Sequence, residues 1–471
     1  MPGKTSTTLR RNVIDGREKE PSPVTVEERM ATGKALREKC PRGSQANWTP
    51  AANRPNPIDV LKATEKGRLP ELLPIRYGRM KESPFGFYRG SAAIMAGDLA
   101  GIETTGIRVQ ACGDCHVSNF GGYASPERRL VFDINDFDET LPAPWEWDVK
   151  RLAASLVIAR RESGDRERDC RDAARIVAKS YRKHLREYAQ MPALEVWYSY
   201  LEAEVLIEEA KDKAEKRRWE RIEKKARKGT PEHIFPHIAE FEKGRWRILD
   251  NPPGAYHPKQ FGSRQRFVGE MFLRYRQTLP EERRVVLDRY HIEDMARVVV
   301  GVGSVGTRCG AILLLAGERD PFFLQIKEAH ASVLEAYAGK SRYENHGQRV
   351  VVGQRMLQAA SDVFLGWTRD DEGHDYYFRQ LRDMKMKVDV VALPKEDWNE
   401  YIRICGWALA RAHARTGDPA KLAGYLGKSG RFDEAIEGFA AVYADQNERD
   451  YETFLKAVRA GKVPADANAS P

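Results

Sequence analysis

Five side chains that end in a carboxylate or an amide oxygen follow one another closely in the chain: Asp114, Asn119, Asp133, Asp136 and Asp138. The first two lie in the segment CGDCHVSNFGG, and the other three lie in RLVFDINDFDET. Oxygen ligands of this kind suit Mg²⁺, which takes few protein ligands and leaves room for phosphate groups. The composition of these segments therefore predicts a magnesium site that acts on phosphate.

Local elements would bring these oxygen atoms together. The apolar run Leu130–Phe132 is typical of a strand that would carry Asp133 at its end, while Asp114 and Asn119 would lie on a loop just upstream. The alternative is an acidic loop without a metal, because Asp and Asn favour turns in general. The order Gly-Asp-x-His-x-x-Asn, followed by an apolar pair and Asp, is far more specific than isolated carboxylates and favours the metal site.

Two cysteines, Cys112 and Cys115, overlap the first of these segments. A CxxC pair can be redox-active or can supply half of a zinc site. No second pair follows at the spacing of a zinc ribbon, and six cysteines in 471 residues make no disulfide framework. We therefore expect reduced thiols with structural roles.

A second glycine-rich segment, VVVGVGSVGTRCGAILLLAG, contains Gly301-x-Gly303-x-x-Gly306. A dinucleotide-binding segment of this type would open a helix, but strand-like residues follow here. The segment therefore predicts a hairpin whose glycines let the backbone approach phosphates. The next run, Phe322–Lys327, alternates so that Lys327 faces away from an apolar row. Lys327 is then either a phosphate ligand or a solvent-facing lysine on an edge strand.

The order Gly-Asp-x-His-x-x-Asn, followed by an apolar pair and Asp133, resembles the catalytic loop and metal-binding aspartate of the aminoglycoside-phosphotransferase branch of kinase-like enzymes. The resemblance implies that Asp114 orients and deprotonates an acceptor hydroxyl. It implies that Asn119 and Asp133 hold Mg²⁺ and that Asp136 assists a second metal ion. His116 would buttress the loop in a structural role. Phosphoryl transfer depends on positioning and charge neutralisation more than on covalent chemistry, so such residues suffice.

The glycine-rich segment resembles the nucleotide-binding hairpin of kinases. It implies an ATP site built from five residues: Gly301, Gly303, Ser304, Gly306 and Lys327. Kinases pair the lysine with a helical glutamate, but the next clear helix, Gly347–Ser361, contains no glutamate. The partner of Lys327 is therefore open between Glu328, Glu335 and Gln354, and we include Glu335 in the predicted nucleotide site.

The order of these parts differs from that of ordinary kinases, in which the glycine loop and the lysine precede the catalytic loop. A circular permutation accounts for the difference without new chemistry, because neighbouring surface termini tolerate it. Tyr376–Lys385 would then supply the strand and hinge that close the nucleotide lobe. Trp407–Arg415 resembles the helix that leads into the catalytic loop.

The whole arrangement resembles an uncharacterised bacterial family, domain of unknown function 2252. Six segments carry the resemblance: SPFGFYRGSAA, QACGDCHVSNFGG, VFDINDFDET, WEWDVKRLAAS, VGVGSVGTR and LRDMK. The resemblance covers roughly Asp59 to Asp450. It implies a kinase-like fold but supplies no substrate.

Apolar periodicity predicts helices, then strands, then helices again. The helical ranges are Arg151–Arg161, Tyr181–Lys228, Tyr401–Ala414 and Phe432–Ala444, and the strand-rich range is Ala296–Lys327. We predict an α+β fold of the protein-kinase-like, two-lobed and circularly permuted type. Its parts would be a mobile or surface-draped polar extension (1–57), a helical lobe with the catalytic loop (58–290), a strand-rich nucleotide lobe (291–395) and C-terminal helices that pack with the helical lobe (396–471).

The net charge of +9 is unevenly distributed along the chain. Lys211–Lys228 has a local charge of +6, whereas Asp114–Asp148 has a local charge of −6. The basic run is either a nucleic-acid footprint or a solvated mixed-charge helix. We expect the helix and no nucleic-acid partner, because Trp219 is the only aromatic residue in the run. Arg79 and Arg89 are either ligands of a phosphate or acceptor, or ordinary surface arginines.

The chain also lacks the patterns of a membrane or secreted protein. No apolar run approaches the ~18–20 residues needed to cross a bilayer. Met1–Gly33 has no apolar stretch of the kind found in a secretory signal. We expect a cytoplasmic protein without a membrane partner.

These features together predict a phosphotransferase that depends on ATP and Mg²⁺. Its acceptor, a small molecule or a protein, is not identified by the sequence. The alternatives are a pseudokinase or nucleotide-binding regulatory protein, and an enzyme that transfers AMP from the same site.

Overall fold

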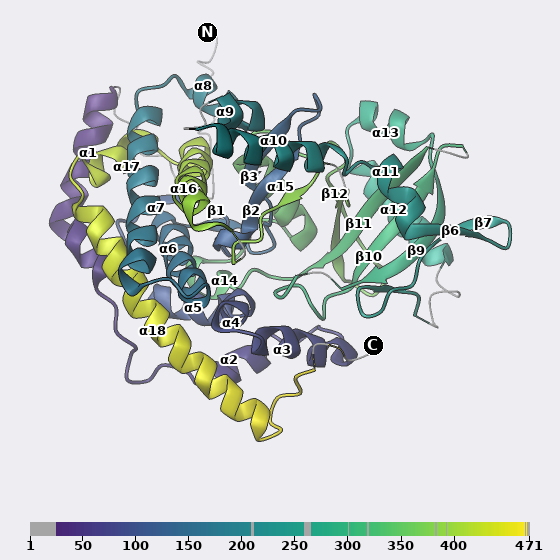
Figure 1. The fold of residues 1–471 in the computed structure, drawn as a ribbon, viewed down its shortest axis with the longest axis horizontal. Helices are drawn as coiled ribbons and strands as arrows, with labels where there is room; N and C mark the ends of the chain where they lie inside the picture. Colours follow the sequence, from purple (N-terminus) through teal and green to yellow (C-terminus); the bar gives the residue numbers. More distant parts are fainter. Residues whose placement is uncertain are drawn as a thin grey trace, which may run out of the picture.

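Helices and strands are concentrated on different sides of the molecule. The computed structural model describes residues 25–208, 212–258, 265–299, 301–317, 320–381, 384–391, 393–466 and 468. Helices fill one side, and a six-stranded sheet forms the centre of the other (Figure 1). Every strand pair within these ranges is antiparallel. The predicted α+β class is therefore confirmed.

The secondary-structure elements follow one another with short connections. The α-helices are α1 (Val26–Lys39), α2 (Pro57–Ala63), α3 (Leu73–Lys81), α4 (Pro84–Gly90), α5 (Ala92–Ala100), α6 (Trp145–Glu162), α7 (Glu167–Tyr188), α8 (Ala193–Tyr198), α9 (Ala203–Glu208), α10 (Lys213–Arg227), α11 (Pro231–Ile238), α12 (Gln265–Gln277), α13 (Glu281–Leu287), α14 (Glu335–Ala338), α15 (His346–Leu357), α16 (Lys395–Thr416), α17 (Pro419–Leu426) and α18 (Arg431–Arg459). Three short 3₁₀ helices are η1 (Arg42–Ala46), η2 (Pro70–Leu72) and η3 (Val117–Asn119). The strands are β1 (Arg108–Ala111), β2 (Phe120–Ala124), β3 (Leu130–Ile134), β4 (Leu141–Pro144), β5 (Leu201–Glu202), β6 (Ala239–Glu242), β7 (Arg245–Ile248), β8 (Ala255–Tyr256), β9 (His291–Val298), β10 (Cys309–Leu315), β11 (Pro321–Ala329), β12 (Gly366–Arg369), β13 (Asp375–Gln380) and β14 (Met386–Lys387).

The largest sheet has the strand order β12-β13-β11-β10-β9-β8. Strand β10 falls in the predicted strand-rich range Ala296–Lys327, β9 and β11 overlap its two ends, and the alternation along β11 is confirmed. Phe322, Leu324 and Ile326 join one apolar cluster with residues of α12. Phe323 joins a different cluster with a residue of α11. Because helices cover both of its faces, β11 is a central strand and buried along its whole length.

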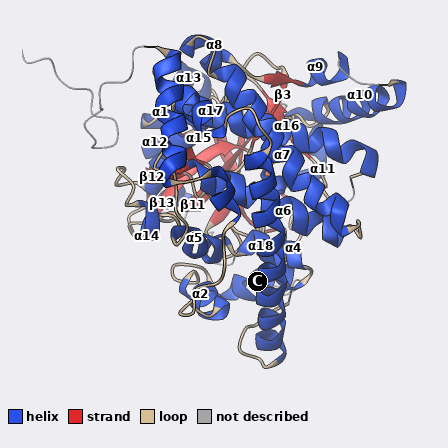
Figure 2. Ribbon diagram, turned by 90° about the vertical axis from the view of Figure 1, so that its left-hand side faces the viewer, coloured by secondary structure: helices blue, strands red, loops and turns tan. Residues whose placement is uncertain are grey.

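Two smaller sheets hold the segment that contains the predicted catalytic loop. Strands β14, β2, β3 and β5 form one sheet, and β1 pairs with β4 in the other. The loop between β1 and β2 carries Asp114 and Asn119. Helix α6 follows β4 directly and is buried from Trp145 to Arg160, where it packs against α7 and α18. In the side view, helices surround most of the strands (Figure 2).

The described part of the predicted N-terminal extension is folded rather than draped loosely over the surface. Helix α1 begins with a capping box formed by Thr25 and Glu28 and packs along α17. A Cβ atom at Gly33 would lie only 1.9 Å from the carbonyl oxygen of Lys421. This close backbone contact is accompanied by Val26 and Met30 of α1, which pack on Ala420 and Ala423 of α17. Residues 1–24 of the extension lie outside the described residues.

Two other regions differ from the predicted layout. The continuous helix expected over Tyr181–Lys228 is interrupted, because α7 ends at Tyr188 and is followed by α8, strand β5, α9 and α10. Pro192, the N-cap of α8, breaks the helical run. Helices α11 and α12 fall within the range predicted for the helical lobe, yet they pack on the six-stranded sheet.

The C-terminal helices close the helical side of the molecule. Helix α18 runs along α6, α7 and η1 (Figure 1). Beyond it, the backbone N–H of Asp466 donates to the carbonyl of Pro74, 2.9 Å away. Across the ranges that the structure describes, no helix combines the length and the apolar character needed to cross a membrane.

Candidate functional site

A pocket forms where the β1–β2 loop, the acidic segment after β3 and the glycine-rich segment after β9 meet. Seven of the eleven predicted site residues line it: Asp114, His116, Asn119, Asp136, Gly301, Gly303 and Ser304. Its volume is about 90 Å³, which is below the ~300–1,000 Å³ usual for ligand pockets.

Helix α6 fixes the backbone at the start of the β1–β2 loop. The carboxylate of Asp148 accepts hydrogen bonds from the backbone N–H groups of Cys112 (2.6 Å) and Gly113 (2.9 Å). It also lies 3.2 Å from Nε2 of His413 on α16. A buried carboxylate that is bonded on several sides is rigid, so the loop is held in one conformation.

Asp114 is held by an arginine of the same helix. Nε of Arg151 donates to Oδ1 of Asp114 at 2.6 Å. Burial raises the pKa of Asp114, and the charge and hydrogen bond of Arg151 oppose that rise. Nε2 of His116 lies 3.9 Å from the other carboxylate oxygen, and the amide of Asn119 donates to the backbone carbonyl of Asp114 at 2.7 Å. Asp114 is thus an oriented carboxylate whose pKa lies above the usual range.

Lys327 of the six-stranded sheet does not line the pocket but contacts two carboxylates that do. Its ammonium group forms an ion pair with Asp138 and lies 4.0 Å from a carboxylate oxygen of Asp136. Asp138 also accepts hydrogen bonds from the hydroxyls of Tyr377 (2.8 Å) and Ser304 (3.2 Å). Burial by itself would raise the pKa of Asp138, but Lys327 and Tyr377 lower it to about 2. The same carboxylates raise the pKa of Lys327.

None of the three candidate partners contacts Lys327. Glu328 faces away along the strand and pairs with Arg308 at 2.9 Å. Glu335 accepts a hydrogen bond from the backbone of Ser332 (3.3 Å) and lies outside the pocket lining. Gln354 donates to Gln358 (2.8 Å). The partner of Lys327 is instead an aspartate, Asp138.

Helix α15, which lacks a glutamate, contributes an arginine to the segment that follows Asp138. Arg349 is 2% exposed. Its guanidinium donates to the backbone carbonyls of Asp138 and Thr140, each at 2.7 Å, and to that of His330 at 2.8 Å. The helix therefore fixes the acidic segment through its backbone rather than by binding the lysine.

Asp133 is not brought into the pocket. Its carboxylate is 3% exposed and accepts two hydrogen bonds from the Arg411 guanidinium of α16, at 2.7 and 2.6 Å. All five residues of β3 are buried, so the strand ends inside the protein and not at the pocket. Asp136 and Asp138, on the following loop, are the carboxylates that face the pocket.

The glycine-rich segment is anchored by the valines between its glycines. Val302 and Val305 are buried against residues of α2 to α4 and of η2. Gly301 and Gly306 have φ angles of +59° and +95°, a region that favours glycine. Gly306 packs against the Arg68 side chain, so it shapes the segment rather than lining the pocket.

Oxygen donors line the pocket, although among the described residues the cluster of His, Cys, Asp or Glu side chains close enough together to hold a metal ion is Asp370, Glu372 and His374. Asp136 is partly exposed, and Asn119 uses its amide N–H for the loop; both residues line the pocket. With Asp138, these residues form an all-oxygen set of the type that Mg²⁺ prefers. The nearby Cys112 and Cys115 are free, buried thiols, and burial raises the pKa of Cys115 to about 11.

The basic stretch lies on helix α10, which packs near β3 and β14. Arg218 forms an ion pair with Asp397 at 2.6 Å, and Arg227 pairs with Glu204 at 2.6 Å. Trp219 packs against the main apolar core. Lys211 lies outside the described residues. The described part of the stretch is thus a surface helix of mixed charge.

Comparison with protein families gives one match. Residues 68–457 match the family described as an uncharacterized protein conserved in bacteria, DUF2252. The chain belongs to this family. The DUF2252 match spans every residue that lines the pocket except Thr64. No curated protein and no solved structure matches the chain.

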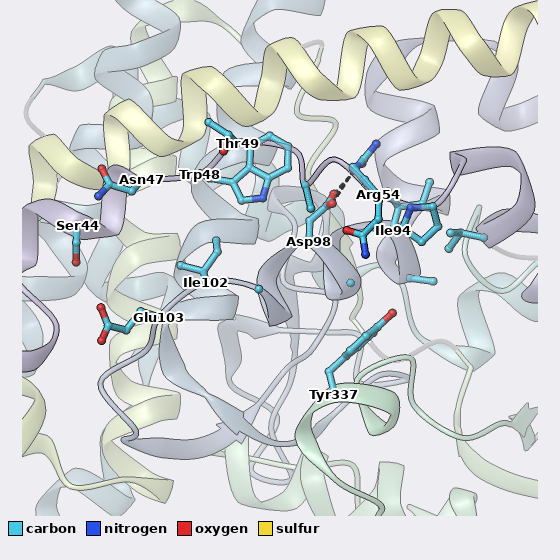
Figure 3. A pocket seen from close by; sticks show the side chains of 17 residues that line it. Ser44, Asn47, Trp48, Thr49, Arg54, Ile94, Asp98, Ile102, Glu103 and Tyr337 are labelled. Atoms are coloured by element: carbon cyan, nitrogen blue, oxygen red, sulfur yellow. Dashed lines mark hydrogen bonds and ion pairs between the residues drawn. The ribbon is translucent and has the colours of Figure 1, made fainter.

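A larger hollow of this DUF2252 chain, about 620 Å³, begins at the same helix as the pocket (Figure 3). Ala93 of α5 lines both of them. The arginine in this hollow, Arg54, is fully paired. It lies 2.6 Å from Asp98 and 2.7 Å from Asp450. Burial would lower the pKa of Arg54, but the two carboxylates raise it above its ordinary value.

Proposed function

We propose that this chain is an ATP- and Mg²⁺-dependent phosphotransferase with a two-lobed, kinase-like and circularly permuted fold. One observation carries the proposal. Lys327 of the strand-rich side meets Asp136 and Asp138 beneath a glycine-rich segment. The same pocket holds an oriented aspartate, Asp114, on the β1–β2 loop. A lysine, a metal-type oxygen set and an oriented base are the parts that phosphoryl transfer needs.

Each residue has a role that its surroundings support. Asn119, Asp136 and Asp138 would hold Mg²⁺, which neutralises charge on the phosphates when bound. Lys327 would turn from Asp138 toward the phosphates. Asp114 would accept the proton of the acceptor hydroxyl, and its raised pKa brings it closer to the value that suits a general base near neutral pH.

The placement of α16 supports the permutation. Its last residue, Thr416, accepts a hydrogen bond from the backbone N–H of Gln110 in β1 at 3.2 Å. A Cβ atom on the next residue, Gly417, would lie 2.8 Å from Val109. A helix that leads into the catalytic loop in ordinary kinases would join the chain at this place. Here α16 comes near the end of the sequence, yet it still meets the strand that precedes the loop.

The test is turnover of ATP that carries a label at the γ or the α phosphate. We expect γ-label to be released or transferred by the wild-type chain and not by Asp114→Ala or Asp136→Asn. Asp371→Asn, a change in an exposed ion pair with Arg274, is the matched control and should keep full activity. Transfer of α-label instead would identify an AMP transferase. A wild-type chain that does not bind Mg-ATP would contradict the proposal.

A nucleotide-binding regulatory protein is the second candidate. Among the residues that the structure describes, no glutamate contacts Lys327, and this observation favours it. Binding of Mg-ATP without release or transfer of either label, in the presence of candidate acceptors, would support this candidate over the enzyme.

A further inference from the structure

One wall of the pocket is cationic. Arg68, Arg76 and Arg89 line the pocket from the N-terminal part of the chain, and Asp114, Asp136 and Asp138 line it from the segment after β1. The proposed function uses the acidic wall and leaves the three arginines without a role.

The guanidinium of Arg76 is the most deeply buried of the three, at 1% exposure. Its Nη2 donates to the hydroxyl of Thr64 and the carbonyl of Gly90, each at 3.1 Å. Its Nε and Nη1 atoms have no hydrogen-bond partner, and neither does the buried Nε of Arg89. Buried donors without an acceptor cost free energy. A ligand that supplies acceptors would remove that cost.

These arginines also form no close ion pair with a described residue. Arg68 donates only to the backbone carbonyls of Thr64 and Val305. Within the described ranges, no carboxylate oxygen lies within 4.0 Å of any of the three guanidinium groups, and 4.0 Å is the limit for an ion pair. Burial lowers the pKa of Arg68 to about 9 and also lowers those of Arg76 and Arg89.

Two other arginines near the pocket differ from these three, because their guanidinium groups form ion pairs with carboxylates. Arg54 in the neighbouring hollow binds two carboxylates. Arg151, on the acidic wall, binds Asp114. Arg54 and Arg151 are therefore neutralised from within the chain, whereas the three arginines of the cationic wall form no ion pair with the described residues and in this respect resemble Arg349, which donates only to backbone carbonyls.

We propose that Arg68, Arg76 and Arg89 form a binding subsite for a phosphate group carried by a substrate. A phosphate has several acceptor oxygens and up to two negative charges, which matches guanidinium donors that approach from more than one side. The inference rests on the proposed function only for the origin of that phosphate, which is either the terminal phosphate of the nucleotide or a phosphate on the acceptor.

The test is calorimetric titration of the full-length chain with inorganic phosphate, without nucleotide. We expect Arg89→Gln and Arg76→Gln to weaken phosphate binding by about 10-fold or more, since each removes charge-assisted hydrogen bonds. Arg37→Gln is the matched control. Arg37 donates to the carbonyls of Tyr425 and Gly424 at the contact of α1 with α17, and its loss should leave phosphate binding unchanged. If Arg76→Gln does not fold, Arg89→Gln decides.

A repeat of the titration with a non-hydrolysable ATP analogue and Mg²⁺ separates the two origins. Phosphate that still binds beside the analogue marks a subsite for a phosphorylated acceptor. If the analogue displaces phosphate, the subsite holds the terminal phosphate of the nucleotide. The subsite is overturned if the wild-type chain shows no saturable phosphate binding, or if both folded variants keep the wild-type affinity. Phosphate binding in a chain that does not bind ATP would refute the proposed function and leave the subsite standing.

Discussion

Two aspartates three positions apart have different surroundings, and this difference decides which of them can serve the proposed metal site. Asp136 faces the pocket near Lys327, whereas Asp133 is enclosed with Arg411. Asp133 is 3% exposed, so its carboxylate is not accessible to a cation from the pocket. Asp136 is therefore the residue whose loss should affect Mg²⁺.

The first prediction compares Asp136→Asn with Asp133→Asn. We expect Asp136→Asn to fold with near wild-type stability and to lose most of its Mg²⁺-dependent nucleotide binding. Asp133→Asn leaves the Arg411 charge buried without its partner and should lower the free energy of unfolding by about 3–5 kcal/mol. Urea unfolding and nucleotide titration of each variant measure the two effects. If Asp133→Asn were stable but lost the Mg²⁺ dependence of nucleotide binding, Asp133 would be a ligand of the metal ion.

The second prediction concerns the pH dependence of the pair between Lys327 and Asp138. The folded-state pKa of Asp138, about 2, lies below its unfolded value of ~3.9. The pair therefore stabilises the fold fully above pH ~4, and this contribution is lost as the pH falls from ~4 through about 2.

Lys327→Met removes the cation and leaves Asp138 in its partly buried position, where burial raises its pKa. We expect a loss of about 2–3 kcal/mol at pH 7. The loss should shrink as the pH is lowered from 7 toward 4, because the folded variant then takes up the proton. Urea unfolding of the wild type and of Lys327→Met at several pH values measures the difference between their free energies of unfolding. A difference that is independent of pH would mean that Lys327 does not stabilise the Asp138 carboxylate.

At the scale of elements, backbone contacts between helices matter as much as apolar faces. Helices α1 and α17 approach so closely that Gly33 and Gly424 each face a carbonyl of the other helix. The glycine-rich segment is likewise held by valines that reach into helices α2 to α4. Both contacts connect segments that are far apart in the sequence.

The third prediction tests the contact between α1 and α17. In Gly33→Ala the new methyl group meets the backbone of Lys421 at 1.9 Å, so one helix must shift. We expect a loss of about 1–3 kcal/mol in the free energy of unfolding. Gly43→Ala is the control, because a Cβ there has nothing within 4 Å. Equal stability of the two variants in urea unfolding would mean that α1 does not pack on α17.

At the scale of the whole molecule, the pocket joins the two sides of the fold. Lys327 of the large sheet pairs with Asp138 of the pocket lining, Asp114 comes from the loop beneath α6, and Arg76 comes from α3. A ligand that contacts all three of these segments would therefore stabilise the molecule as a unit.

The fourth prediction follows from this arrangement. Mg-ATP at a free concentration one hundred times its Kd should raise the free energy of unfolding by about 2.7 kcal/mol, by mass action alone. Lys327→Met should abolish the increase, while Asp371→Asn should keep it. Urea unfolding with and without Mg-ATP measures both. An increase that persists undiminished in Lys327→Met would place the nucleotide elsewhere in the molecule.

Short-range features of the site could be predicted from the sequence alone. The spacing of Asp114 and Asn119 and the glycine pattern with Ser304 identified residues that line one pocket. The alternation along β11 predicted the face of Lys327. These features depend on neighbours a few positions away, where strand geometry and turn preferences act directly.

Only the tertiary structure decided which residues meet across the chain. Asp133 is withdrawn from the pocket by Arg411, 278 positions later. Lys327 finds Asp138, 189 positions earlier, and not a glutamate of the next helix. The cationic wall consists of three arginines that form no ion pair with a carboxylate of the described residues. Sequence spacing carries no information about such pairs, because burial and ion pairing are settled by packing between distant segments.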